Sequence, residues 1–227
     1  MTGEKNFELF LGLNSLLYHR NDQFVLHKNQ RSLVAEKITK IVFEQNLSSI
    51  TFDEAITKTY FFHKLSKVVE MPVLYIDFDL LYSGYLAANI LPQNENVELY
   101  APKENWYDHL AQITNKISTK KYLVLIDSLN GFFTTMSENK ESGRIINSVL
   151  VLLASSALKS NSAILFGSTA KFKDGGWALP GIGRKVLQIQ KMNFLSVQEK
   201  NQTPNLISFN HDNSVKLVLP LDGLDLI

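Results

Sequence analysis

Two apolar runs that each end in acidic side chains constrain the fold of this chain most strongly. Residues 122–126 (Tyr-Leu-Val-Leu-Ile) are apolar without alternation and lead directly into Asp127. Residues 73–76 (Val-Leu-Tyr-Ile) lead in the same way into Asp77 and Asp79. Strands that are apolar on both faces are typical of a parallel sheet with helices above and below it.

The position of these acids suggests a site. Because open α/β sheets bind ligands at the carboxyl ends of their strands, the carboxylates that follow the two runs are candidate functional groups. An aspartate after a parallel strand also commonly caps a helix or forms a turn, so both interpretations stay open at this point.

Helical and strand patterns alternate along the chain and predict an α/β fold with one main domain. We expect a β-α-β unit over residues 47–79 and a loop over residues 167–183. Residues 144–158 are apolar on nearly every side, which predicts a helix covered by the rest of the fold. The predicted helices are 32–45, from about 59 onward, 82–90, 104–118 and 144–158; the predicted strands are 47–52, 73–76, 97–100, 122–126, 163–166, 185–194, 206–210 and 215–219, the last three in an antiparallel arrangement.

Residues 1–46 are predicted to form an N-terminal extension that packs on the core or on a neighbouring subunit, and residues 47–227 to form the domain itself. The extension carries a short apolar patch at residues 7–17 and a strand candidate at residues 23–27. No linker divides the remainder.

Composition excludes several classes of protein. Lys and Arg number 23 against 22 Asp and Glu, so no global charge attracts nucleic acid, and such binding requires a local patch. With no cysteine there is no disulfide or thiolate chemistry, and the five histidines lack metal-ligand spacing. No apolar run approaches the roughly 20 residues of a membrane span, and the first fifteen residues do not resemble a signal peptide. We therefore expect a cytoplasmic protein without membrane contact.

Several segments, in order, resemble the RecA/RadA-like ATPases, over roughly residues 45–227. The segment 52–59 (Phe-Asp-Glu-Ala-Ile-Thr-Lys-Thr) aligns with the phosphate-binding loop of that family, keeping Lys58 and Thr59 at the mouth of a helix but replacing both glycines. Residues 76–79 (Ile-Asp-Phe-Asp) match the strand that ends in the catalytic glutamate, with Asp79 in its place. Asp127, followed by Ser128, matches the magnesium-side aspartate of the Walker B strand.

The resemblance implies a RecA-like P-loop NTPase core: a mainly parallel central sheet flanked by helices, with antiparallel C-terminal strands. It also implies that Lys58, Thr59 and Asp127 bind nucleotide, that Thr59 and Asp127 hold Mg²⁺ beside ATP, and that Asp79 is a weak substitute for the catalytic glutamate. The departures from the family's motifs argue against ATP binding and hydrolysis. A non-glycine residue forced into the loop conformation costs about 1–3 kcal/mol, and aspartate lies roughly 1 Å too far back to position water well.

A third matched region suggests nucleic-acid binding. The family has a polar sensor pair, a DNA-contacting loop, and then glycines before an arginine; the corresponding residues here are Ser168 and Thr169, the loop 171–177, and residues 181–184 (Gly-Ile-Gly-Arg). Basic side chains neutralise phosphates and aromatic side chains stack on bases. The predicted nucleic-acid-binding residues are Lys171, Phe172, Lys173, Trp177, Arg184 and Lys185.

Three functions follow from the sequence. The first is a non-hydrolysing or weakly hydrolysing RecA/RadA paralogue that assists DNA recombination or repair, binding single-stranded DNA and a RecA/RadA-family partner or itself. The second is an assembly module of the kind found in Elongator, whose RecA-like subunits form a ring and bind RNA. The third is a genuine but slow ATPase.

Overall fold

The computed structural model describes residues 33–102, 106–173, 176–178, 192–200, 203–210 and 212–221. Eight strands form one sheet in the order β10-β9-β8-β1-β5-β4-β2-β3. All pairs from β8 to β3 are parallel, whereas β9 pairs antiparallel with both β8 and β10. The strands are β1 (Leu47–Phe52), β2 (Val73–Asp77), β3 (Val97–Tyr100), β4 (Leu123–Asp127), β5 (Ala163–Thr169), β8 (Asn193–Lys200), β9 (Thr203–Phe209) and β10 (Val215–Pro220).

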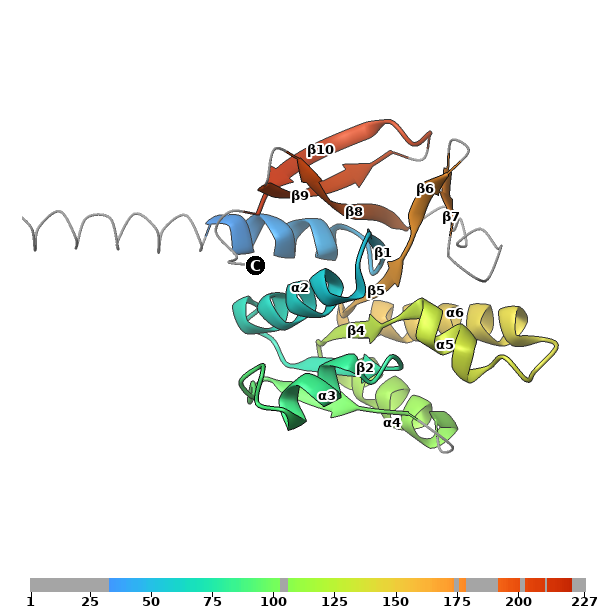
Figure 1. The fold of residues 1–227 in the computed structure, drawn as a ribbon. Helices are drawn as coiled ribbons and strands as arrows, with labels where there is room; N and C mark the ends of the chain where they lie inside the picture. Colours follow the sequence, from blue (N-terminus) through green and yellow to red (C-terminus); the bar gives the residue numbers. More distant parts are fainter. Residues whose placement is uncertain are drawn as a thin grey trace, which may run out of the picture.

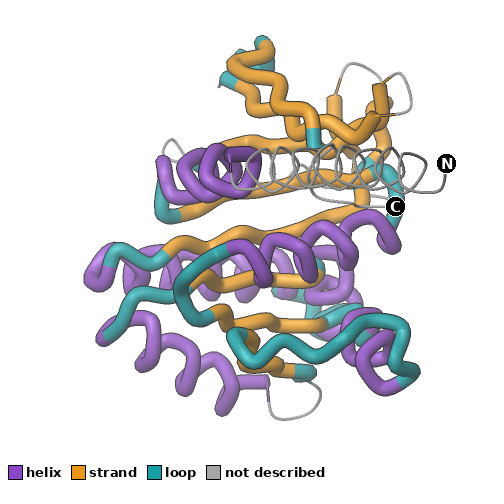
Figure 2. Tube along the Cα trace, turned by 90° about the vertical axis from the view of Figure 1, so that its left-hand side faces the viewer, coloured by secondary structure: helices purple, strands orange, loops and turns teal. Residues whose placement is uncertain are grey.

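Helices cover both faces of this sheet (Figures 1 and 2). The helix over residues 33–44 packs with α2 and α3 in one apolar core, and α4 and α6 pack in a second core on the opposite face. The labelled helices are α2 (Ala55–Val68), α3 (Leu81–Ala87), α4 (Trp106–Thr119), α5 (Leu129–Thr135) and α6 (Ser142–Ser160). The two-sided burial explains why the central strands contain unbroken apolar runs.

The predicted fold class is confirmed: the sheet is mostly parallel, and its C-terminal strands are antiparallel. One helix boundary was predicted wrongly, because α2 begins at Ala55 rather than near Thr59. After Asp127 the chain enters a short helix, α5, in which Ser128 Oγ accepts a hydrogen bond from the Gly131 backbone N–H at 3.2 Å.

The region predicted as a loop over residues 167–183 also contains regular structure. Strand β5 continues to Thr169, and β6 (Lys171–Lys173) pairs antiparallel with β7 (Gly176–Ala178) in a separate two-stranded sheet. In Figure 1 this hairpin stands at the end of the molecule where β5 leaves the main sheet.

Helix α6 is less covered than its sequence suggests. Its inner face packs against the sheet and α4, but Val151, Leu152 and Leu158 on its outer face are exposed. The prediction that this helix is covered on nearly every side is therefore wrong.

Some predictions fall on residues outside the described ranges. They are the apolar patch at 7–17, the strand at 23–27, and the first part of the strand at 185–194, together with Arg184 and Lys185. Within the described ranges, no helix combines the length and the apolar character needed to cross a bilayer.

Candidate functional site at the carboxyl edge of the sheet

The connection between β1 and α2 is short. Strand β1 ends at Phe52 and α2 begins at Ala55, so only Asp53 and Glu54 link them. The backbone N–H of Lys58 already donates to the Glu54 carbonyl at 3.2 Å, within the first turn of the helix. A phosphate-binding loop needs a longer run of backbone amides turned around the anion, and this connection has no room for one.

Phe52 explains why the helix starts early. Its side chain is fully buried, and its ring lies 5.5 Å from Phe61 and 6.0 Å from Phe62. This aromatic cluster holds the end of β1 directly against α2. The end of β1 is therefore packed tightly against the first turns of α2.

Lys58 points into the protein. Its side chain is fully buried, with Nζ 2.6 Å from Asp79 Oδ2 and ion-paired with Asp127 Oδ1. Burial lowers the pKa of Lys58 from its ordinary value, and the charge of Asp79 opposes that shift. The ammonium group is thus neutralised by carboxylates of the same chain.

Asp127 is saturated by groups of this chain. Its carboxylate, also fully buried, accepts hydrogen bonds from Lys58, from Tyr75 Oη, and from Thr59 Oγ1 at 3.3 Å. Thr59 Oγ1 also lies 3.1 Å from the Ala55 carbonyl, one helical turn back. The structure therefore brings together the three residues predicted to hold nucleotide and metal, but their polar groups bind one another.

Asp77 and Asp79 have different roles, although they are two residues apart. Asp77 Oδ2 accepts hydrogen bonds from Ser83, from N at 2.7 Å and from Oγ at 2.6 Å, so it faces α3. Its other oxygen has no partner in the described part of the chain, and burial raises the pKa of this carboxyl. Asp79 lies on the loop after β2, where it pairs with Lys58.

The loop that carries Asp79 is fixed from two sides. The backbone amides of Phe78 and Asp79 donate to the Asp127 carbonyl at 2.6 and 3.2 Å. On the other side, a Cβ added to Gly131 would lie 2.2 Å from Asp79 Oδ1 and 2.9 Å from the Phe78 carbonyl carbon. Glycine is therefore required at position 131 for α5 to approach this loop.

The predicted sensor residues are at the end of β5. Ser168 Oγ is buried without a hydrogen-bond partner in the described residues. The backbone of Thr169 is held by the Asn130 side chain, which accepts from Thr169 N at 3.0 Å and donates to Thr169 O at 3.3 Å. These two hydrogen bonds connect α5 to β5, so the Asn130 side chain has a structural role.

The predicted nucleic-acid-binding residues are placed only in part. In the β6–β7 hairpin, Phe172 and Trp177 are register partners, and Lys171 pairs with Ala178. Only the backbone of this hairpin is described, and Arg184 and Lys185 lie outside the described residues.

The sequence analysis did not identify three residues that contact the acidic side chains of the site: Tyr75, Ser83 and Gly131. Tyr75 supplies a signal that was available: a hydroxyl within an otherwise apolar buried strand needs a hydrogen-bond partner. Among the described residues, no group of three or more His, Asp or Glu side chains is arranged to hold a metal ion.

No family model matches the chain, and no curated protein matches it. A solved structure does: the crystal structure of the RadB recombinase superposes with a TM-score of 0.50 over 78% of this chain and 86% of that chain, at 15% sequence identity. The chain has a RecA-like fold. At this identity the similarity shows the fold and leaves the activity to be argued from the site.

Proposed function

We propose that this chain is a RecA-fold accessory protein of DNA recombination or repair that does not hydrolyse ATP, and that it acts by binding DNA and a partner protein. The observation that carries the proposal is the buried ion pair between Lys58 and Asp127. In this arrangement the lysine that would bind phosphate is an internal structural group.

Nucleotide binding would require breaking this cluster. A phosphate at the start of α2 has to draw Lys58 away from Asp127 and Asp79, which leaves a fully buried carboxylate without its cation. Loss of one partner from a buried pair costs about 3–5 kcal/mol. The β1–α2 connection of Asp53 and Glu54 supplies negative charge in return, so there is little to offset that cost.

Hydrolysis is opposed by the position of Asp79. An acid that positions water must have a free carboxylate oxygen directed at the reacting phosphate. Here Asp79 Oδ2 binds Lys58, and Oδ1 lies against Gly131. We therefore assign Asp79 a structural role.

The β6–β7 hairpin is the proposed nucleic-acid-binding element. It combines Lys171 and Lys173 with Phe172 and Trp177 in one short hairpin that continues from the end of β5. Such a combination suits single-stranded nucleic acid because phosphate contacts supply affinity and stacking is tolerant of sequence.

Fluorescence anisotropy with a labelled single-stranded DNA tests this proposal. The double variant K171A/K173A is expected to bind more weakly and to reduce the dependence of log affinity on log salt by about 0.7 per lost phosphate contact. The matched control K37A/K40A removes two exposed lysines from the helix over residues 33–44 and should bind as the wild type does. Unchanged affinity and salt dependence in K171A/K173A, or a clear preference for tRNA over single-stranded DNA, would contradict the proposal.

A further inference from the structure

The outer face of α6 is an exposed apolar stripe. Val151, Leu152 and Leu158 are 56%, 45% and 62% exposed. The fourteen residues from Ile145 to Leu158 contain no charged side chain. Apolar surface that is contiguous on a helix and bounded by charges at both ends is typical of an interaction site.

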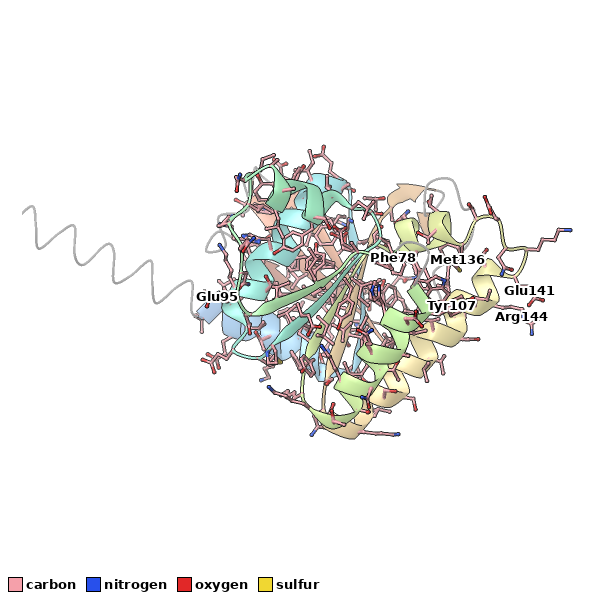
Figure 3. The ribbon with its side chains drawn as sticks, turned by 90° about the horizontal axis from the view of Figure 1, so that it is seen from below. Phe78, Glu95, Tyr107, Met136, Glu141 and Arg144 are labelled. Carbon is pink, nitrogen blue, oxygen red and sulfur yellow. The ribbon has the colours of Figure 1, made fainter. Side chains whose placement is uncertain are left out.

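The stripe continues onto α4. A groove of about 320 Å³ runs between the two helices and is lined by residues that include Tyr107, Leu110, Ile145 and Leu152. Figure 3 shows Tyr107 of α4 on the helix next to α6, and Glu141 and Arg144 near the start of α6. Tyr107 is 59% exposed, so an aromatic ring stands at the edge of the apolar surface.

We propose that this surface binds a second copy of the chain, with the two α6 helices packed antiparallel across a two-fold axis that lies between Val151 and Leu152. In a two-fold interface each residue contacts a residue that contacts it in return. An axis at this position pairs Val151 with Leu152 of the other copy, Ser148 with Ser155, and Ile145 with Leu158. The stripe is thus complementary to itself, with small residues beside its centre and branched apolar residues further out.

The charges at the two ends of the surface are also complementary. Asp108 and Glu141 are exposed at the N-terminal ends of α4 and α6, whereas Lys120 and Lys159 are exposed at the C-terminal ends. Antiparallel packing brings acidic ends onto basic ends and aligns the helix dipoles favourably. Arg144 would approach Lys159 of the other copy, and these two cations repel each other. Glu141, which pairs with Arg144 at 2.8 Å, offsets part of that repulsion.

The size of the surface determines the expected affinity of the dimer. A stable interface buries about 800 Å² on each partner, which is more than one helix face supplies. The interface therefore includes the part of α4 around Tyr107, which faces the C-terminal half of the other α6. We expect a reversible dimer with micromolar affinity. This inference does not depend on the proposed function, because neither the Lys58 cluster nor the β6–β7 hairpin is part of the surface.

Sedimentation velocity over a range of protein concentrations tests the dimer. The wild type is expected to shift from monomer to dimer as concentration rises, and Leu152→Glu is expected to remain a monomer. Ile90→Glu is the matched control, since Ile90 is somewhat more exposed than Leu152 (55% against 45%) but lies outside the surface, and it should behave as the wild type does. A wild type that stays monomeric, or a Leu152→Glu variant that still dimerises, would overturn the proposal.

Cross-linking tests the geometry and does not depend on the stability of the charged variant. Because the chain has no cysteine, single cysteines can be introduced without background. A short bis-maleimide should join Ile145→Cys protein to Leu158→Cys protein when the two are mixed. Leu158→Cys alone should not cross-link, because its two copies would lie about 20 Å apart along the helix axes. Cross-linking of Leu158→Cys to itself, or its absence from the mixture, would show that the helices do not pack in this way.

Discussion

Lys58 and Asp127 form an ion pair in which both side chains are fully buried, and this pair joins the start of α2 to the end of β4. The two residues are 69 positions apart in the chain. Tyr75 and Thr59 complete the environment of the carboxylate, so the pair is both desolvated and hydrogen-bonded. The lysine that the sequence predicts as a phosphate ligand is here part of the folded interior.

We expect Asp127→Asn to destabilise the protein by about 3–5 kcal/mol, because it leaves the Lys58 ammonium buried with a weakened partner. Adding Lys58→Met should recover part of the loss. Urea unfolding of the two single variants and the double variant measures both effects. Glu98→Gln is the control: it breaks an exposed pair with Lys116 and should cost less than about 1 kcal/mol. Equal effects of Asp127→Asn and Glu98→Gln on the free energy of unfolding would mean that the buried pair stabilises the fold no more than an exposed pair does.

Asp77→Asn should behave in the opposite way, although Asp77 and Asp127 are register partners on β2 and β4. Burial raises the pKa of Asp77, so the ionised form is disfavoured in the folded state. The contribution of the protonated Asp77 carboxyl to the stability of the fold is fully present below the unfolded pKa near 3.8. It is lost as pH rises through the higher folded pKa. The asparagine keeps an acceptor for Ser83, so the variant should be at least as stable as the wild type at pH 7.

Urea unfolding of Asp77→Asn between neutral pH and the acid range follows this difference. The advantage of the variant over the wild type should shrink as pH falls and the wild-type carboxyl takes up its proton. A variant that is less stable than the wild type at neutral pH would show that the charge of Asp77 is needed.

His63 is expected to make the protein less stable in mild acid. Its ring is buried beside Tyr82, with Nδ1 3.3 Å from Tyr82 Oη, and burial, followed by the charges of Lys67 and Lys64, lowers its pKa from 6.5 to about 4. The unfolded chain takes up a proton below pH 6.5 and the folded protein does not, so His63 should cost about 3 kcal/mol of stability between neutral pH and pH 4. His63→Gln, which can still bond to Tyr82, should flatten this part of the pH profile. An unchanged profile would assign the loss to other groups.

Two glycine-to-alanine substitutions should have opposite effects. At Gly131 a Cβ would meet the Asp79 carboxylate and the Phe78 backbone, so Gly131→Ala should destabilise the protein by about 1–3 kcal/mol. At Gly84, within α3, the Cβ meets nothing within 4 Å, so Gly84→Ala should stabilise it by up to about 1 kcal/mol. Thermal unfolding of both variants measures the contrast. A neutral Gly131→Ala would mean that α5 moves freely relative to the Asp79 loop.

The central strands were predictable because burial on both faces leaves a strong local signal, as in the run that ends at Asp127. The helix boundaries next to the candidate site were not predictable in this way. The start of α2 depends on the packing of Phe52 against Phe61 and Phe62, and the end of β4 is followed by α5 because Ser128 caps that helix. Each of these boundaries depends on a specific side-chain contact, which the periodicity of apolar residues does not reveal.

The sequence predicted that four residues of the candidate site lie close together, but it predicted neither their pairing nor the further residues that contact them. The alignment of motifs brought Lys58, Thr59, Asp79 and Asp127 to one edge of the sheet, and the structure places them there. Which groups pair with which depends on the direction of each side chain over 21 and 69 residues of separation. The hydroxyl of Tyr75 and the close approach of Gly131 are equally long-range features.

Isothermal titration calorimetry with ATP and Mg²⁺ on the wild type and on Lys58→Met shows whether Lys58 is available to bind phosphate. Lys58→Met keeps an unbranched side chain of similar shape, one heavy atom shorter, and removes its charge. If Lys58 is committed to Asp127 and Asp79, neither protein should give a saturable heat up to millimolar ATP. Micromolar binding by the wild type that is lost in Lys58→Met, with both proteins folded by near-UV circular dichroism, would contradict the account and restore Lys58 as a phosphate ligand.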